Sequence, residues 1–429
     1  MGNTSSPNPL RIAIRGVVGL FAILALTSPA LAAPSSPIEP RNYAKEITLA
    51  TKGTGDFPGY RIVALTSLPG GIVLASYDGR PDGGDAPSPN SIVQRRSTDA
   101  GETWGPQTYI SKGQVGSSSL QKYGFSDPSY VVDQKTGKVF NFHVFSKNQG
   151  FLGSVLGNDD ANLNVLSAQV SVSTDKGISW STDPTHQTSL PPSASSLITK
   201  SIKPVGTTVN GVANVGGVVG AFASSGEGIQ LRYGPHAGRL IQQFAGKVIQ
   251  PDGSKINQAY SVYSDDSGAT WKMGTPVGRG MDENKVVELS NGDVMLNSRP
   301  GDGTRYRIVA ISKDGGVTYG TPWSETQLPD PVNNAGFTRM YPDAPQGSAE
   351  AKILLFTNAA NTSARNLGKI RFSCDDGKTW SAGRAFHSSD MSYSTVTPLG
   401  NDMFGIFYEG NNGDMTFAKV DKEWIGVNC

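Results

Sequence analysis

The chain has 429 residues, of which 37 are Lys or Arg and 36 are Asp or Glu, so its formal net charge is +1. A charge balance near zero argues against a nucleic-acid-binding protein, and an aromatic content of 8% argues against disorder. Glycine occurs 52 times, about 12% of the chain against a usual ~7%, whereas charged residues make up only 17%. This composition favours a large all-β protein with many tight turns.

The first 32 residues have the pattern of a secretory signal peptide. Arg11 and Arg15 precede an apolar run over residues 17–26, and residues 30–32 then provide a small-x-small cleavage site. The run is too short to span a membrane comfortably, so we expect a secreted protein with no membrane span. Residues 33–44 are expected to form a disordered leader and residues 45–429 the folded domain.

An eight-residue pattern recurs five times along the chain. It reads Ser-x-Asp-x-Gly-x-x-aromatic and occupies residues 97–104, 173–180, 264–271, 312–319 and 373–380. Its Asp can accept hydrogen bonds from the backbone that follows, and its Gly can adopt a positive φ, so the octet predicts a tight turn. Each octet follows an alternating apolar stretch and is expected to close a hairpin, so we interpret its Asp as structural.

A second unit, two apolar strands joined by a turn, recurs six times between the octets. Its copies span residues 60–77, 129–145, 228–244, 286–298, 339–358 and 394–408. Six hairpins, five of them followed by an octet, predict six four-stranded units of about 65 residues, the last ending in a degenerate copy at residues 420–424. The predicted fold is therefore a six-bladed β-propeller, in which residues 184–223 form a long loop insertion.

Arginines, carboxylates and one tyrosine gather at the open ends of these hairpins, opposite their turns. They are Arg61, Arg80, Asp85, Asp127, Glu227, Glu283, Arg299, Arg339, Arg365, Tyr393 and Glu409. Equivalent ends of the inner strands converge at the axis of a propeller, so we expect one shared site. Several arginines at one mouth suit an anionic oxygen group such as a carboxylate, which a guanidinium binds bidentately.

The cysteines and histidines show no metal-binding pattern. Only Cys374 and Cys429 are present, and the four histidines lack ligand spacing, so we expect no metal and no cofactor. Export would place the protein in an oxidising compartment, and we predict a disulfide between the two cysteines over the alternative of two unpaired thiols.

Together these motifs resemble the secreted exo-sialidases (neuraminidases) of glycoside hydrolase family 33, in which the octet is called an Asp-box. The resemblance covers residues 45–429 and rests on residues 60–62, the five octets, Asp85, residues 281–284, residues 297–299, Arg365 and residues 391–394. One departure is Val63, where the family usually has Pro. The resemblance implies a retaining exo-α-sialidase that acts through a covalent tyrosyl-enzyme intermediate. It implies sialylated glycoproteins, gangliosides and oligosaccharides as partners, and we expect a monomer.

The resemblance also implies the catalytic roles. Tyr393 corresponds to the nucleophile, Glu283 to the base that activates it, and Asp85 to the acid/base. Sialic acid carries a carboxylate on its anomeric carbon, where a carboxylate nucleophile would meet like charge. A neutral phenol avoids this repulsion, and its paired Glu can take the proton.

For substrate binding, Arg61, Arg299 and Arg365 correspond to the triad that holds the substrate carboxylate, and Glu409 to the residue that orients Arg61. Arg339 is a rival to Arg365. For Asp127 and Glu227, a substrate contact and a structural role remain equally open.

Three interpretations compete at this stage. The first is the secreted exo-α-sialidase. The second is a glycosidase of the same fold that prefers deaminated sialic acid, or a trans-sialidase, and the third is a non-catalytic propeller that binds sialic acid. The third predicts loss of the nucleophile, its base or a triad arginine, and the chain has lost none of these.

Overall fold

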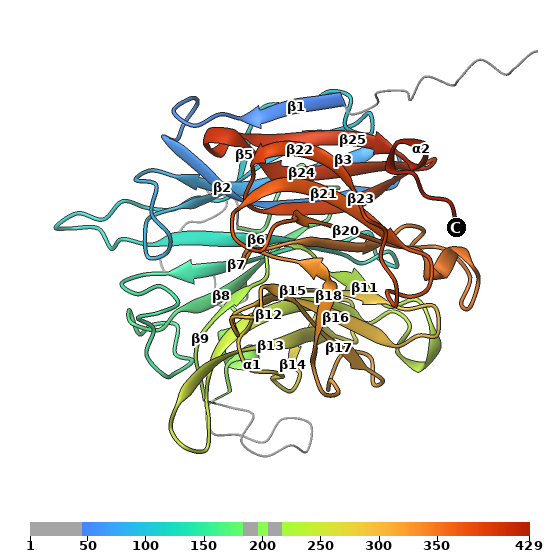
Figure 1. The fold of residues 1–429 in the computed structure, drawn as a ribbon. Helices are drawn as coiled ribbons and strands as arrows, with labels where there is room; N and C mark the ends of the chain where they lie inside the picture. Colours follow the sequence, from blue (N-terminus) through green and yellow to red (C-terminus); the bar gives the residue numbers. More distant parts are fainter. Residues whose placement is uncertain (1–44, 183–195, 205–216) are drawn as a thin grey trace, which may run out of the picture. The chain divides into compact units, whose positions relative to one another are not determined.

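Six β-sheets follow one another along the described residues of the computed structural model, 45–182, 196–204 and 217–429 (Figure 1). Each sheet is built mainly from consecutive antiparallel strands, as the repeated hairpins predicted. This arrangement confirms the six-bladed β-propeller. The predicted signal peptide, 1–32, and leader, 33–44, lie outside the described residues.

The first, fourth and fifth sheets each have four strands joined in sequence, as predicted. In the first they are β2 to β5, over Gly59–Leu68, Ile72–Arg80, Ser91–Ser97 and Thr108–Ser111. In the fourth they are β15 to β18, over Met281–Glu288, Val294–Pro300, Tyr306–Ser312 and Trp323–Pro329. In the fifth they are β19 to β22, over Gly336–Arg339, Leu354–Ala359, Asn366–Ser373 and Arg384–Asp390. The third strand of each sheet ends on the Ser that begins an octet.

The second and third sheets depart from this pattern. The second contains β6 to β8, over Gly124–Val132, Val139–Ser146 and Ser167–Ser173, and β10, Gly226–Glu227, pairs parallel with β6. The third contains β9 and β11 to β14, over Val218–Ala223, Ile229–Gln230, Leu240–Ile249, Lys255–Ser264 and Lys272–Met273. Both β9 and β11 pair with β12.

The inner strand of the third sheet therefore begins at Val218 and not at Gly228, which corrects the prediction. Part of the expected loop 184–223 is strand β9, and a short helix, α1, spans Thr199–Ile202. Residues 184–195 and 205–216 of that segment lie outside the described residues.

The sixth sheet is closed by the opposite end of the chain. Strands β23 to β25 span Ser394–Gly400, Met403–Glu409 and Met415–Asp421, and β1, Lys45–Ala50, pairs antiparallel with β25 (Figure 1). The prediction of a degenerate octet at residues 420–424 is wrong, because these residues finish β25 and begin helix α2, Lys422–Ile425. Short 3-10 turns cover Gly234–His236, Glu350–Lys352 and Asn411–Gly413.

All five octets form the same turn. In the first, Ser97 Oγ accepts a hydrogen bond from the Gly101 amide over 2.9 Å, and Asp99 accepts from the Thr103 amide and hydroxyl over 2.9 and 2.5 Å. Ala100 and Gly101 have φ of 55° and 84°. The other four copies repeat these contacts. The octet Asp is therefore occupied by its own turn, which supports its structural role.

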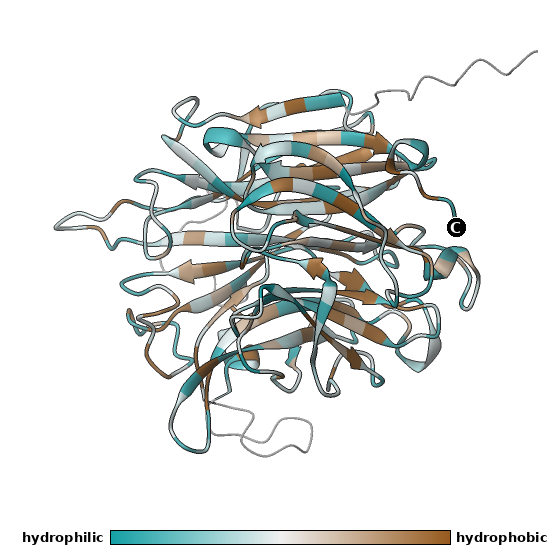
Figure 2. Cartoon of the chain, viewed as in Figure 1, coloured by the Kyte–Doolittle hydropathy of each residue, from teal (hydrophilic) through white to brown (hydrophobic). Residues whose placement is uncertain are grey.

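The octet glycines contact the neighbouring sheet. A Cβ at Gly268 would lie 2.2 Å from Phe140 of the second sheet, and one at Gly101 would lie 2.6 Å from Phe417 of the sixth. The octet aromatics pack into the same layer, with the rings of Trp271 and Phe142 4.8 Å apart. Hydrophobic residues alternate with polar ones along many strands (Figure 2). The hydrophobic core thus lies between adjacent sheets, and each octet packs against the sheet before it.

Cys374 and Cys429 form a disulfide, with their Cα atoms 5.5 Å apart. Cys374 is the second residue of the fifth octet, so the bond fastens the last residue of the chain to the fifth sheet. Trp424 and Val427, just before it, are buried in the core shared by the fifth and sixth sheets.

Candidate active site

Tyr393, Glu283 and Arg299 meet where the inner strands begin. Arg299 Nη1 donates a hydrogen bond to Glu283 Oε2 over 2.7 Å and another to the Tyr393 hydroxyl over 3.0 Å. Glu283 lies close enough to that hydroxyl for its negative charge to act on it. Glu283 is 2% exposed and Tyr393 7% exposed. One guanidinium thus bridges the phenol and the carboxylate that the sequence had paired.

Two further arginines flank the Tyr393 ring. The guanidinium carbon of Arg61 lies 5.2 Å from the ring centroid and that of Arg365 lies 5.8 Å from it. Arg339 does not share this place, because it stacks 4.7 Å over Tyr233. The geometry therefore favours Arg365 as the third arginine. Three positive charges around one neutral ring form a site suited to an anionic group.

Arg61 owes its position to Glu409 and to a bulge in β2. Arg61 Nε donates to Glu409 Oε2 over 2.9 Å, and the Ile62 amide donates to Glu409 Oε1 over 2.6 Å. Ile62 has φ 65°, which marks the bulge and turns its amide toward the carboxylate. Glu409, 2% exposed, ends β24, so the first and sixth sheets are joined at the site.

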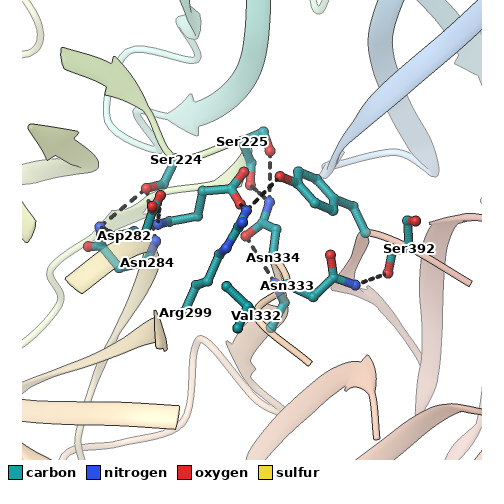
Figure 3. Close-up of polar contacts among 12 residues, drawn as sticks. Ser224, Ser225, Asp282, Asn284, Arg299, Val332, Asn333, Asn334 and Ser392 are labelled. Carbon is teal, nitrogen blue, oxygen red and sulfur yellow. Dashed lines mark hydrogen bonds and ion pairs between the residues drawn. The ribbon is translucent and has the colours of Figure 1, made fainter. Parts of the chain in front are cut away.

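Glu283 is aimed by a second bulge, at the start of β15. The pairing with β16 shifts between Met281 and Asn284, and the Glu283 amide donates to Asp282 Oδ1 over 2.8 Å. The Asn284 side chain donates to Ser224 Oγ and to the Asp282 carbonyl (Figure 3). These contacts fix the backbone on both sides of Glu283.

Asp85 lies on the loop after β3. Its carboxylate pairs with Arg80 Nη1 over 2.6 Å, and Asp78 holds Arg80 from the other side over 3.0 Å. Arg80 and Asp78 are almost fully buried, whereas the Asp85 side chain is 80% exposed. An exposed carboxyl on a buried support can reach a leaving group that projects from the site.

Asp127 belongs to the same charge cluster. It has φ 64°, and its amide donates to Asp78 Oδ1 over 3.1 Å. Burial, together with the negative charges of Asp78 and Glu283, raises the pKa of Asp127 well above its usual range. The structure therefore places Asp127 with the site.

Glu227 lies elsewhere, which corrects its expected place at the open end. It accepts a hydrogen bond from Thr66 over 2.5 Å and, with Arg339, lines a cavity of about 710 Å³. The same cavity is lined by Leu68, which ends β2 just before its hairpin turn, and by Asn401, which lies in the turn between β23 and β24. The cavity therefore opens at the turn ends of the inner strands. The reason is the early start of β9, because Ser224 and Ser225 occupy the end near the site instead.

The electrostatics of Tyr393 indicate how it could react. Burial and the nearby Glu283 charge raise the pKa of Tyr393 well above its ordinary value, although Arg299 and Arg61 act in the opposite direction. The resting phenol is therefore neutral. It can become a nucleophile only as its proton passes to a base, and the nearby carboxylate is Glu283, which shares the Arg299 Nη1 donor with the hydroxyl.

Five residues near the site were not found from the sequence: Arg307, Asp330, Val332, Asn333 and Asn334. They belong to the connection between β18 and β19 and to its anchor on β17. Figure 3 shows Val332, Asn333 and Asn334 of this connection. No motif marks them, since their contacts arise from the packing of distant strands. Only Asp330-Pro331 after a strand signals a turn there.

No group of three or more His, Cys, Asp or Glu side chains in the described residues could hold a metal ion. None of the helices described is long and apolar enough to cross a membrane.

Comparison with known proteins agrees with this geometry. Residues 74–406 match the model of the BNR repeat-like domain family. A sialidase of Micromonospora viridifaciens is 51% identical over 95% of this chain and 59% of its own length. A sialidase of Bacteroides fragilis is 28% identical over 86% of this chain and 63% of its own length.

The chain is also similar to a sialidase of known structure. The Hadza microbial sialidase Hz136 has a TM-score of 0.74 at 25% identity, covering 89% of this chain and 69% of that one. The present chain spans about three fifths of the length of the two curated relatives. The resemblance noted from the sequence is confirmed: this chain belongs to the BNR repeat-like domain family and is a sialidase homologue.

Proposed function

We propose that this protein is a secreted, retaining exo-α-sialidase that hydrolyses terminal sialic acids from glycoconjugates. The observation that carries the proposal is the contact of Arg299 with both Glu283 and Tyr393, between two further arginines. A carboxylate bound by the three arginines would bring the anomeric carbon that bears it against the Tyr393 hydroxyl. The disulfide between Cys374 and Cys429 supports export to an oxidising compartment.

In the first step, the Tyr393 oxygen bonds to the anomeric carbon and the bond to the leaving oxygen breaks. Glu283 takes the phenol proton, and Asp85 donates a proton to the leaving oxygen. In the second step, the Asp85 carboxylate takes a proton from water and the water oxygen attacks the anomeric carbon. Tyr393 then leaves and regains its proton from Glu283. Two inversions at one carbon give net retention.

The arginines act electrostatically in both steps. They hold the substrate carboxylate in a partly buried site, where charge interactions are stronger than in water. They also favour the negative charge that develops on the Tyr393 oxygen, since Arg299 donates to it directly. Arg61 and Arg299 therefore offset part of the effect by which burial keeps the phenol neutral.

The test uses fluorogenic sialosides, N-acetylated and deaminated, with the first-formed product followed by NMR. We expect hydrolysis with an α-configured product. Preference for the deaminated sugar, or transfer to an added sugar, would support the glycosidase or trans-sialidase alternatives, and binding without turnover would support the non-catalytic propeller.

Tyr393→Phe removes the nucleophile from the same assay. We expect kcat to fall by at least roughly 10³-fold without loss of the fold. Tyr130→Phe is the matched control, because Tyr130 is also buried and its hydroxyl donates one hydrogen bond, to Gln94 over 3.0 Å. Equal activity of the two variants would contradict the assignment of Tyr393.

A further inference from the structure

We propose that the loop of residues 330–335 is the positioning element of the active site, which fixes Arg365 and Tyr393 relative to each other. This inference rests on the proposed function and adds residues to it. The loop links β18 of the fourth sheet to β19 of the fifth, and Tyr393 directly precedes β23 of the sixth. None of its side chains is needed as an acid, a base or a nucleophile.

The first contact is a carbonyl aimed by an unusual backbone. Val332 has φ 67°, in the left-handed region that β-branched residues rarely adopt. Its carbonyl oxygen accepts a hydrogen bond from Arg365 Nη2 over 3.0 Å. An ordinary φ at Val332 would change the direction of the adjoining peptide groups. The contact with Arg365 therefore depends on the costly left-handed conformation.

The second contact reaches the backbone next to the nucleophile. Asn333 Nδ2 donates to the Ser392 carbonyl over 2.6 Å (Figure 3). Ser392 immediately precedes Tyr393, and its amide donates to the Glu409 carbonyl over 3.0 Å. Asn333 is fully buried. One loop thus touches both the third arginine and the peptide that carries the phenol.

A buried ion pair anchors the loop. Arg307 Nη1 lies 3.1 Å from Asp330 Oδ2, and both side chains are 0% exposed. The same Nη1 donates to the Asn333 carbonyl over 2.7 Å, and the Asn333 amide donates to Asp330 Oδ1 over 2.7 Å. Charged hydrogen bonds in a dry interior are strong and directional, so residues 330–333 are held to β17 as a unit.

The far end of the loop is fixed independently. Lys285 Nζ donates to Asn334 Oδ1 over 2.9 Å, and Asn334 Nδ2 donates to the Ser225 carbonyl and hydroxyl over 3.0 and 2.7 Å. Lys285 follows Glu283 by two residues on β15. The loop is therefore tied to strands β15 and β17 of the fourth sheet, to the turn between β9 and β10, and to the residue before Tyr393. A small displacement of a reacting group is costly in catalysis, so this anchoring should appear in the rate.

Asn333→Ala tests the inference, with Asn141→Ala as the matched control. Both asparagines are fully buried, and Asn141, on β7 near the turn end of the second sheet, contacts Ser76 of the first sheet and His143 over 3.2 and 3.1 Å. Kinetics on an aryl sialoside, the rate of covalent labelling by a 2,3-difluorosialyl fluoride and the melting temperature are measured for each. We expect Asn333→Ala to lower kcat and the labelling rate at least tenfold, and Asn141→Ala to leave both within twofold after a similar loss of melting temperature.

A second pair of variants tests the Val332 carbonyl. Val332→Gly accepts φ 67° freely and should retain the wild-type KM, whereas Val332→Pro, whose φ is locked near −65°, should raise KM at least tenfold through Arg365. An Asn333→Ala variant no slower than Asn141→Ala overturns the inference while the wild type hydrolyses sialosides. A wild type inactive on every sialoside overturns the proposed function instead.

Discussion

Glu409 and Arg61 form a charged pair although they lie 348 positions apart in the chain, with Arg61 Nε 2.9 Å from Glu409 Oε2. The other oxygen of Glu409 accepts from the Ile62 amide over 2.6 Å, so the carboxylate fixes both the side chain and the bulge that presents it. This pair joins the last sheet of the propeller to the first. One buried carboxylate therefore orients an arginine at the site and also links the last sheet to the first.

We predict that Glu409→Gln lowers kcat/KM by roughly 10- to 100-fold, the worth of one charged hydrogen bond. The amide retains an acceptor for Ile62 but loses the charge that holds Arg61. Steady-state kinetics on an aryl sialoside measures the change. Glu102→Gln is the control, since Glu102 pairs with Lys45 and Lys419 on the outer strands of the same sheet, and it should retain wild-type kinetics. Equal kinetics for the two variants would show that the charge of Glu409 is not needed to orient Arg61.

Gly268→Ala should destabilise the propeller more than Gly253→Ala. Both glycines have φ near +80°, so both alanines meet the same backbone penalty of about 1–2 kcal/mol. Only at Gly268 would the new Cβ clash, at 2.2 Å from Phe140, whereas nothing lies within 4 Å at Gly253. Urea unfolding should show an additional loss of about 1–3 kcal/mol for Gly268→Ala. Equal losses in the free energy of unfolding would show that the octet only forms a turn and does not pack against the neighbouring sheet.

Replacing both Cys374 and Cys429 by Ser should lower the free energy of unfolding by about 4 kcal/mol on the chain-entropy model, because the bond closes a loop across a separation of 55 residues. Strand β21 runs from Asn366, beside Arg365, to Ser373, so the bond lies at the end of the fifth sheet away from the site. Activity of the folded variant should therefore be unchanged. Denaturation with and without a reducing agent measures the loss. A large fall in kcat at low temperature would show that the disulfide also supports the active site.

The sequence located the parts of the site that short motifs carry. Arg61, Glu283 and Tyr393 each stand in a recognisable local pattern, and the octets identified the propeller because turn chemistry is local. The strand that closes the sixth sheet could not be predicted, since Lys45–Ala50 has no hairpin partner nearby and pairs with residues near the other end of the chain. The positioning loop was missed for the same reason. Asp330-Pro331 signals a turn, but no residue type marks Val332 for a left-handed φ, which follows from contacts made after folding.

Glu227 was misplaced because β9 begins the third sheet ten residues before the predicted strand, and its true position carries a prediction. Burial raises the pKa of Glu227 to about 7 from an ordinary 4.5, against hydrogen bonds from Thr66 and Thr397. A carboxyl whose pKa is higher in the folded state binds its proton more tightly there. Its contribution to stability is complete below pH 4.5 and is lost as the pH rises to about 7.

Glu227→Gln cannot lose a proton, so it should be about as stable as the wild type near pH 4.5. It should become more stable than the wild type by on the order of 2 kcal/mol near pH 8, because only the wild type then carries a buried charge. Urea unfolding of both proteins across this pH range measures the difference. Other groups that titrate in the window, such as Asp78 with a pKa raised to about 6 by burial, are common to both proteins and cancel. Parallel stability curves would show that the Glu227 carboxyl reaches solvent through the cavity at the turn ends.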